Sequence, residues 1–282
     1  MEARRIATSD GTELAVRVWP AGGGRPFVLV HGLASNARMW DGVAEHLVAS
    51  GHPVAAVDLR GHGRSDKPDD GYDFATVTDD LVAVIGALGW DRPVAAGQSW
   101  GGNVVLELAY RHPALTAGLA CVDGGTIDLS ERFSTWEACE AALAPPRTAG
   151  TTFDQIESMF RRRHADWPEA GIQGALACFE RRADGTAAPR LTFERHMRIV
   201  RAMWEQKPSK LYPAIEVPVL LVPADSGEAG RRAGKPSSVA AAEAALPVAR
   251  TRWMVGDHDL HAQHPAALAE LLHASVDNGF FR

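Results

Sequence analysis

Short runs of apolar residues alternate with amphipathic segments along most of the chain. Two opening segments, residues 4–8 and 12–19, predict strands joined by a hairpin turn at Ser9-Asp10-Gly11. Residues 26–30 form a continuous apolar run, which is typical of a strand buried on both faces of a parallel sheet. Further short runs predict five more strands, at residues 53–57, 93–96, 117–122, 217–222 and 251–255.

The segments between these runs predict helices. They cover residues 38–50, 74–88, 103–111 and 237–245, and a closing helix is expected over residues 265–274. Two opening strands followed by alternating strands and helices are typical of an α/β protein with right-handed crossovers. We therefore expect a mostly parallel, eight-stranded sheet flanked by helices.

The alternation stops between residues 126 and 210. No buried strand is expected there, and four segments have helical patterns, at residues 135–143, 152–164, 171–181 and 192–206. We interpret this region as a helical cap, or lid, inserted after the sixth strand. The predicted organisation is a core of residues 1–125 and 211–282 and a cap of residues 126–210. Aromatic and methionine side chains of the cap are expected to pack within it and, in part, to line a pocket.

Composition and charge narrow the class of protein. A hydrophobic content of 46% and a charged content of 23% over 282 residues are ordinary for a globular enzyme. The net charge of −6 argues against a nucleic-acid surface, and the basic cluster Arg161-Arg162-Arg163 is typical of a solvated helix face. The sequence shows no run of membrane-span length and no apolar core of a signal peptide. We expect a cytoplasmic monomer or homodimer that binds neither nucleic acid nor membrane.

Cysteine and glycine patterns give no sign of a bound group. Cys121, Cys139 and Cys178 form neither a paired framework nor a Cys-x-x-Cys motif, so we expect them to be reduced. No cluster of His, Cys and Asp has zinc spacing, and no glycine-rich phosphate-binding motif occurs. The sequence therefore predicts no cofactor and no metal.

The strongest chemical signal is the segment Gly97-Gln98-Ser99-Trp100-Gly101. It follows a predicted strand and precedes a predicted helix, which is the context of a nucleophile elbow. A serine at such a turn has a strained backbone, and the residues two positions away must be small. The helix N-terminus behind the serine favours developing negative charge. We therefore predict that Ser99 is a nucleophile and not an ordinary turn serine.

Together with other motifs, this segment resembles the α/β-hydrolase fold family, in its serine branch with a helical cap. The resemblance covers nearly the whole chain and rests on His31-Gly32, Asp58-x-Arg60-Gly61-x-Gly63-x-Ser65, Gly97-x-Ser99-x-Gly101-Gly102, and His258 followed by Pro265. The chain order of nucleophile, acid and histidine also matches that family. We interpret the motif at residues 58–65 as structural. His31 is expected either to brace the neighbouring loop or to be a buried structural histidine.

A serine hydroxyl needs a base, and the last loop offers three histidines. His258 follows a Gly-Asp turn directly after the last predicted strand, and it has the family's distance to Pro265. We favour His258 as the base and keep His261 as the alternative, with a place at the pocket rim as its other interpretation. His264 is expected at the surface.

The acid that orients the base has two candidates. Family members usually carry it in the loop after the penultimate strand, where the corresponding position is Gly227 and Asp225 lies two residues earlier. Some members, haloalkane dehalogenases among them, carry it one strand earlier, where Asp123 follows the run 117–122. We favour Asp123 and keep Asp225 as the alternative. An ordinary turn or loop carboxylate is the other interpretation of each.

The resemblance implies a two-step acyl transfer. Ser99 attacks a carbonyl carbon while the histidine accepts its proton, and the backbone N–H groups of Leu33 and Trp100 stabilise the oxyanion. A serine nucleophile argues against haloalkane dehalogenases and epoxide hydrolases, which use a carboxylate. We expect hydrolysis of an ester, lactone or thioester of a small, mostly apolar acyl compound. The alternatives are a cofactor-free lyase, an acyltransferase, a C–C bond hydrolase and a non-catalytic ligand-binding protein.

Overall fold

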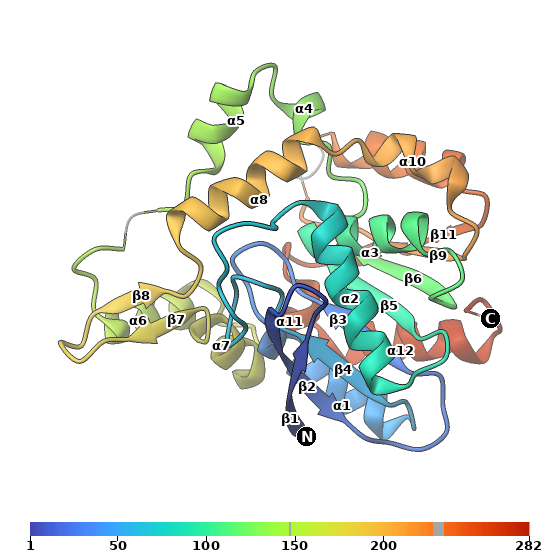
Figure 1. Cartoon of the computed structure of the whole chain (residues 1–282), viewed down its shortest axis with the longest axis horizontal. Coiled ribbons are helices and arrows are strands. Elements are labelled where there is room, and N and C mark those ends of the chain that lie inside the picture. The colour runs from blue at the N-terminus through green and yellow to red at the C-terminus, as the bar shows by residue number, and fades with distance from the viewer. Residues whose placement is uncertain (147, 228–233, 282) are drawn as a thin grey trace.

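Eight strands form one sheet in the computed structural model, which describes residues 1–146, 148–227 and 234–281. The strands are β1 (Glu2–Ala7), β2 (Glu13–Trp19), β3 (Phe27–Val30), β4 (Val54–Val57), β5 (Val94–Gln98), β6 (Gly118–Val122), β9 (Val219–Val222) and β11 (Ala249–Thr251). They lie in the order β1-β2-β4-β3-β5-β6-β9-β11 (Figure 1). The β1–β2 and β2–β4 pairs are antiparallel and the other pairs are parallel. The predicted fold class is confirmed.

Apolar cores lie on both faces of the sheet because successive side chains of a strand point to opposite sides. Phe27 and Leu29 of β3 belong to one core, and Val28 and Val30 belong to the other. Helices cover both faces: α1 (Asp41–Ala49), which follows the 3-10 turn η1 (Ala37–Trp40), and α12 (Pro265–Asp277) pack on the first core, and α2 (Phe74–Leu88), α3 (Trp100–Arg111) and α10 (Lys235–Ala245) pack on the second. Within the described ranges, no helix has both the length and the apolar character needed to cross a membrane.

The segment between β6 and β9 is mostly helical and also contains a small hairpin. Its elements are α4 (Leu129–Arg132), α5 (Trp136–Leu143), α6 (Phe153–Arg163), α7 (Glu169–Leu176), β7 (Phe179–Arg181), β8 (Ala187–Pro189), α8 (Phe193–Glu205), η2 (Pro208–Lys210) and η3 (Tyr212–Ala214). A helix over all of 171–181 was therefore a wrong prediction, because residues 179–181 pair antiparallel with β8 across a turn at Gly185. That residues 126–210 form a cap domain separate from the core stays a prediction.

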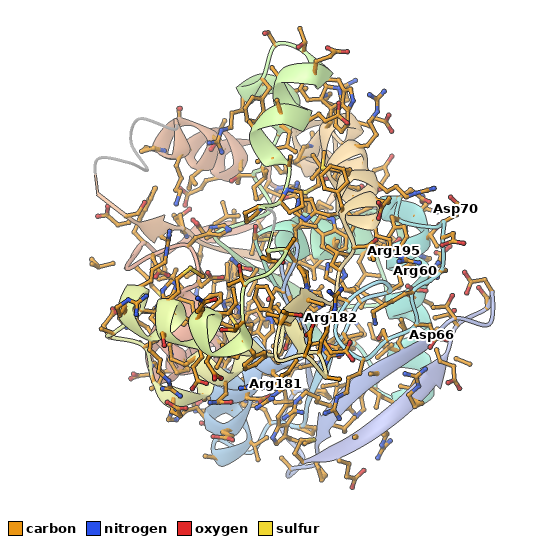
Figure 2. All side chains as sticks on the ribbon, turned by 90° about the vertical axis from the view of Figure 1, so that its left-hand side faces the viewer. Arg60, Asp66, Asp70, Arg181, Arg182 and Arg195 are labelled. Carbon is orange, nitrogen blue, oxygen red and sulfur yellow. The ribbon has the colours of Figure 1, made fainter. Side chains whose placement is uncertain are left out.

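Charged contacts tie α8 to the loop that follows residues 58–65. The Arg195 guanidinium donates to the backbone oxygens of Lys67 and Pro68 at 2.7 and 3.0 Å and pairs with Asp69 at 3.0 Å. Arg198 pairs with Asp70 one turn further along the helix. Arg195 and Asp70 lie close to each other at the edge of the molecule in Figure 2. The loop thus anchors the inserted segment to the sheet-bearing part of the chain.

The last predicted strand, residues 251–255, is in fact two short strands. β11 pairs with β9 and ends at Thr251, and β12 (Met254–Val255) pairs with β10 (Ala224–Asp225) in a separate two-stranded sheet. Trp253 and Val255, which belong to the predicted strand, are 45% and 79% exposed. The chain therefore leaves the main sheet before residue 254, and the loop bearing His258 follows the smaller sheet.

The residue 58–65 motif holds neighbouring loops together, as its structural interpretation expects. The Asp58 carboxylate accepts from the backbone N–H groups of Ala37 at 2.7 Å and Arg64 at 2.8 Å. Arg60 is buried, and its guanidinium binds both oxygens of the buried Asp80 at 2.6 Å. This ion pair fixes the motif to α2, because a buried charge must keep its partner.

We expect Asp80→Ala to lower the free energy of unfolding by about 3 kcal/mol, because it leaves the buried Arg60 charge without its main partner. The exposed Asp10, which contacts the same guanidinium at 3.0 Å, keeps the loss from being larger. Urea denaturation measures the change. Asp79→Ala, a change of the exposed neighbouring carboxylate, is the matched control and should cost less than about 0.5 kcal/mol. Equal losses in the two variants would contradict the assigned role of the pair.

Candidate active site

Ser99 occupies a sharp turn between β5 and α3. Its backbone has φ 53° and ψ −121°, a conformation that L-residues seldom adopt. A side chain at Gly97 would place its Cβ 2.0 Å from the carbonyl oxygen of Gly101, and one at Gly101 would place it 2.5 Å from that of Val30. The two glycines are therefore sterically required, as the sequence pattern predicted.

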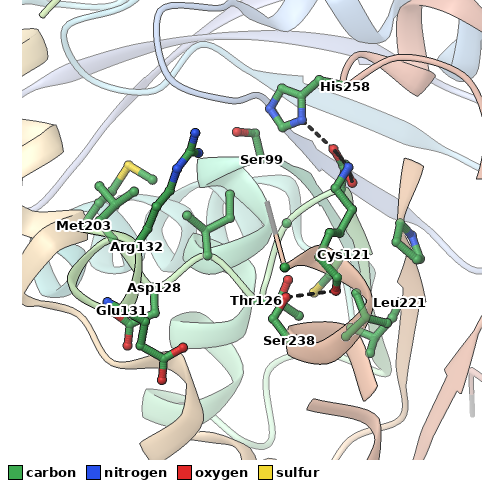
Figure 3. Close-up of a pocket in the computed structure, with 18 of the residues that line it drawn as sticks. Ser99, Cys121, Thr126, Asp128, Glu131, Arg132, Met203, Leu221, Ser238 and His258 are labelled. Atoms are coloured by element: carbon green, nitrogen blue, oxygen red, sulfur yellow. Dashed lines mark hydrogen bonds and ion pairs between the residues drawn. The ribbon is translucent and has the colours of Figure 1, made fainter. Parts of the chain in front are cut away.

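His258 lies at the same end of the sheet as Ser99. Its side chain is 52% exposed, and its Nδ1 lies 2.6 Å from Oδ2 of Asp123. Ser99, Asp123 and His258 line one cavity of about 800 Å³. Figure 3 shows the His258 imidazole turned toward the Ser99 hydroxyl, with the ring nitrogen that does not face the carboxylate on the Ser99 side. The structure thus brings the candidate nucleophile, base and one candidate acid together.

Asp123 follows β6 directly and is itself in the left-handed region, with φ 44°. Its Oδ1 accepts from the backbone N–H of Ala224 at 2.9 Å, and the ammonium of Lys235 lies 2.9 and 3.0 Å from its two carboxylate oxygens. Burial acts to raise the pKa of Asp123, but the contacts from His258, Lys235 and Ala224 outweigh it and lower that pKa. The carboxylate is therefore ionised where it faces the imidazole.

The contact with Asp123 also changes the pKa of the His258 imidazole. Partial desolvation acts to lower its pKa, but the hydrogen bond and the negative charge of Asp123 outweigh that effect and raise the pKa above its ordinary value. The Nδ1–H group donates to the carboxylate, so the other ring nitrogen is left to accept a proton. This is the tautomer that a general base beside a serine requires.

Asp225, the alternative acid, lies outside this arrangement. It is exposed in β10, and its Oδ1 accepts from the backbone N–H of Gly227 at 3.0 Å. No contact between Asp225 and a histidine occurs in the described part of the chain. The structure therefore places Asp123, and not Asp225, beside His258.

His261, the alternative base, is fully buried in α11 (Leu260–Gln263). Its ring packs on Trp40 with centroids 4.5 Å apart, and neither ring nitrogen has a hydrogen-bond partner among the described residues. Burial lowers the pKa of His261 to about 3. It lines neither of the two cavities described here, which is the position of a core residue.

The loop after β3 packs directly against the elbow. A side chain at Gly32 would place its Cβ 3.1 Å from Cβ of Ser99, so the backbone of Leu33 lies beside the serine. The Leu33 N–H has no acceptor in the described part of the chain, and Trp100 is the first residue of α3, whose N–H lacks an intrahelical acceptor. The buried His31 braces this loop, because its ring contacts the oxygen of Gly32 at 2.7 Å and accepts from the N–H of Leu59 at 3.0 Å.

Several residues that shape the site were not predicted from the sequence. Gln98, inside the elbow motif, donates from Nε2 to the backbone oxygen of His258 at 3.0 Å and so links the two loops. Trp167 donates from Nε1 to Asp257 at 3.2 Å, which ties the inserted segment to the His258 loop. Lys235 contacts Asp123 from 112 residues away, and no local pattern signals such a contact.

Leu33 lines two cavities. The first contains Ser99 and His258 and has apolar walls that include Ile127, Leu143 and Met203. The second, of about 620 Å³, lies under the inserted segment and is lined by the aromatic side chains of Phe160, Trp167, Phe179 and Phe193. Part of the aromatic residues of this segment thus line a pocket, as expected.

Charged side chains at the first cavity differ in their engagement. Lys235 is held by Asp123, whereas Arg132 has no carboxylate partner among the described residues. Figure 3 shows Arg132 extending toward Ser99, while Glu131 points away from it. In the predicted basic cluster, Arg161 pairs with Glu157 and Glu169 on the exposed face of α6, away from this cavity.

Comparisons with known proteins agree with this architecture. A family model described as alpha/beta hydrolase fold matches residues 25–148. The AB hydrolase superfamily protein YisY of Bacillus subtilis (strain 168) is 40% identical over 91 residues, which are 32% of this chain and 34% of that protein. A non-heme chloroperoxidase of Streptomyces lividans is 38% identical over 106 residues, 38% of each protein. The chain thus matches little more than a third of the length of these relatives.

Solved structures match over nearly the whole chain. An E-2-(acetamidomethylene)succinate hydrolase has a TM-score of 0.81 at 22% identity and covers 98% of this chain and 99% of its own. An esterase from Rhodococcus sp. ECU1013 has a TM-score of 0.72 at 23% identity, with the same coverage. These likenesses show the fold. Together with the family model and the sheet topology, they show that the chain has the α/β-hydrolase fold.

Proposed function

We propose that the protein is a serine hydrolase that cleaves an ester, a lactone or a thioester of a small, mostly apolar acyl compound. One observation carries this proposal: Ser99, on a strained elbow, and the hydrogen-bonded pair of His258 and Asp123 line the same cavity. A strained non-glycine residue persists only where the surrounding structure holds it, and such residues gather at active sites.

The proposed reaction has two steps. Ser99 Oγ forms a bond to the carbonyl carbon while His258 Nε2 accepts the hydroxyl proton, and the resulting oxyanion is stabilised by the N–H groups of Leu33 and Trp100. The imidazolium, stabilised by Asp123, gives the proton to the leaving group as its bond to carbon breaks. A water molecule then attacks the acyl-enzyme, His258 accepts a proton from it, and the same proton returns to Ser99 as the acid leaves.

The walls of the two cavities support the proposed substrate class. The first cavity has apolar walls but is also lined by Asp128, Glu131 and Arg132. The second has aromatic walls, so an acyl compound can place apolar groups on either side of Leu33. Esterases are among the solved structures of the same fold, including a putative aryl esterase of Burkholderia cenocepacia with a TM-score of 0.70 at 22% identity.

The positive charge of Arg132 narrows the proposed substrate class. The guanidinium of Arg132 faces the cavity without a carboxylate partner among the described residues, and Asp123 already occupies the ammonium of Lys235. We infer that a mostly apolar substrate with a carboxylate at one end binds better than its neutral counterpart, because an arginine fork matches a carboxylate.

We expect a fluorophosphonate to add once to the wild-type protein and not to Ser99→Ala, because the reagent needs an activated serine. Asp123→Asn should label at least about a hundredfold more slowly, since the imidazole loses its orienting carboxylate, whereas Asp225→Asn should label at the wild-type rate. Intact mass over time measures both. Slowed labelling in Asp225→Asn alone would make Asp225 the acid. A folded wild-type protein that does not label would favour the lyase or ligand-binding alternative.

We expect kcat/KM for a neutral ester to fall as the pH decreases through the pKa of His258, because only the neutral imidazole accepts a proton. That pKa is raised, so the acidic limb should lie above the ordinary histidine value of about 6.5. Asp123→Asn removes the negative charge that raises it and should move the limb to lower pH in whatever activity remains. A limb that does not move would mean that Asp123 does not act on the base.

We expect Arg132→Gln to lower kcat/KM for carboxylate-bearing esters relative to neutral ones by about fivefold, the value of a partly exposed ion pair of about 1 kcal/mol. Two matched pairs test both halves of the substrate: 4-carboxyphenyl against 4-carbamoylphenyl butanoate, and the mono-4-nitrophenyl ester of adipic acid against 4-nitrophenyl hexanoate. Arg182→Gln, which changes a cation of the second cavity, is the control. An unchanged ratio in Arg132→Gln for both pairs would remove the carboxylate from the substrate class.

A further inference from the structure

The ammonium group of Lys235 contacts the same carboxylate as His258. Its Nζ lies 2.9 Å from Oδ1 and 3.0 Å from Oδ2 of Asp123, and 3.1 Å from the backbone oxygen of Ala224. An ammonium has three N–H groups, and these contacts can engage all of them. The side chain of Asp123 is 4% exposed and that of Lys235 is 21% exposed, so solvent screens the pair only weakly.

The position of Lys235 in its helix is unfavourable for helix stability. It is the first residue of α10, and a cation at a helix N-terminus is opposed by the helix dipole. Asp123 offsets this cost by placing a negative charge against the ammonium. We therefore attribute the lysine at this position to its contact with the carboxylate and not to a contribution to the stability of α10.

His258 faces charges from several elements. Asp123, at the end of β6, and Asp259, in its own loop, both raise its pKa, and Lys235 from α10 lowers it. The neighbouring His261 of α11 is neutral, since its pKa is about 3, and His164 at the end of α6 lies 3.5 Å from Asp257. Among these groups, Lys235 is thus the cation that lowers the pKa of His258, whereas the two carboxylates raise it.

We propose that Lys235 is a positioning residue for the base: it fixes both oxygens of the Asp123 carboxylate and limits how strongly that carboxylate holds a proton on His258. The proposal rests on the proposed function. The consequence is that activity extends to lower pH, because a less basic imidazole stays neutral at lower pH. The opposite change follows when the ammonium is removed, since the full negative charge of Asp123 then faces the imidazole.

The test compares the acidic limb of kcat/KM for 4-nitrophenyl butanoate in the wild type, Lys235→Met, Lys235→Arg and Lys210→Met. The limb should move to higher pH by about 0.5 to 1 unit in Lys235→Met, as expected for loss of a partly screened charge near the base. Lys235→Arg keeps the charge and should restore the wild-type limb. Lys210 is an exposed lysine of η2 outside the cavity, and its substitution should change nothing.

A titration independent of turnover keeps the proposal testable if a variant is inactive. In protein labelled with ¹⁵N-histidine, the His258 signal is identified by its loss in His258→Asn, and its pKa is followed by NMR. A rise in Lys235→Met that Lys235→Arg reverses supports the proposal. An unchanged or lowered pKa in folded Lys235→Met, or a limb that does not move, overturns it. Absence of hydrolysis in the wild type would overturn the proposed function, while the NMR titration would still decide the role of Lys235.

Discussion

The hydrogen bond between His258 and Asp123 joins two loops that lie 135 residues apart in the sequence. The Asp123 loop follows β6 of the main sheet, and the His258 loop follows β12 of the two-stranded sheet. The pairing of β10 with β12 brings the His258 loop toward β6, and the Ala224 N–H, from β10, also binds the Asp123 carboxylate. The pairing of strands therefore helps to fix the distance between the candidate base and the candidate acid.

The elbow depends on the same kind of long-range constraint. A Cβ at Gly101 would collide with the carbonyl oxygen of Val30 in β3, and a Cβ at Gly124 would lie 2.2 Å from the oxygen of Ser99. The Ser99 N–H donates to the oxygen of Val122 at 3.0 Å. Three neighbouring strands thus hold the serine in its strained conformation, which a short isolated turn would relax. Close packing of backbone against backbone is what makes glycine necessary at these positions.

Much of this could be predicted from the sequence because the signals are local. Buried strands give continuous apolar runs, and the elbow motif gives its own context, so the sheet and Ser99 followed directly. The hairpin of β7 and β8 was missed because its strands have three residues each and are partly exposed. The end of the last strand was misjudged because exposed Trp253 and Val255 have the composition of a core strand. Local pattern does not report burial, and only tertiary contacts separate these cases.

The two candidate acids show the same limit at the level of chemistry. Asp123 and Asp225 both follow buried strands, so their sequences differ little in what they predict, and only the contact with His258 distinguishes them. The chain after β9 carries Gly227 where the resembled family usually has its acid. A short distance further along, it supplies the ammonium of Lys235 to the carboxylate that ends β6. In the resembled family, the segment after the strand corresponding to β9 usually contributes the carboxylate. In this chain, the same segment contributes a positive charge to the carboxylate of Asp123. The Asp123–His258 pair thus depends on residues that follow β6, β9 and β12 and on the start of α10, and no single motif encodes it.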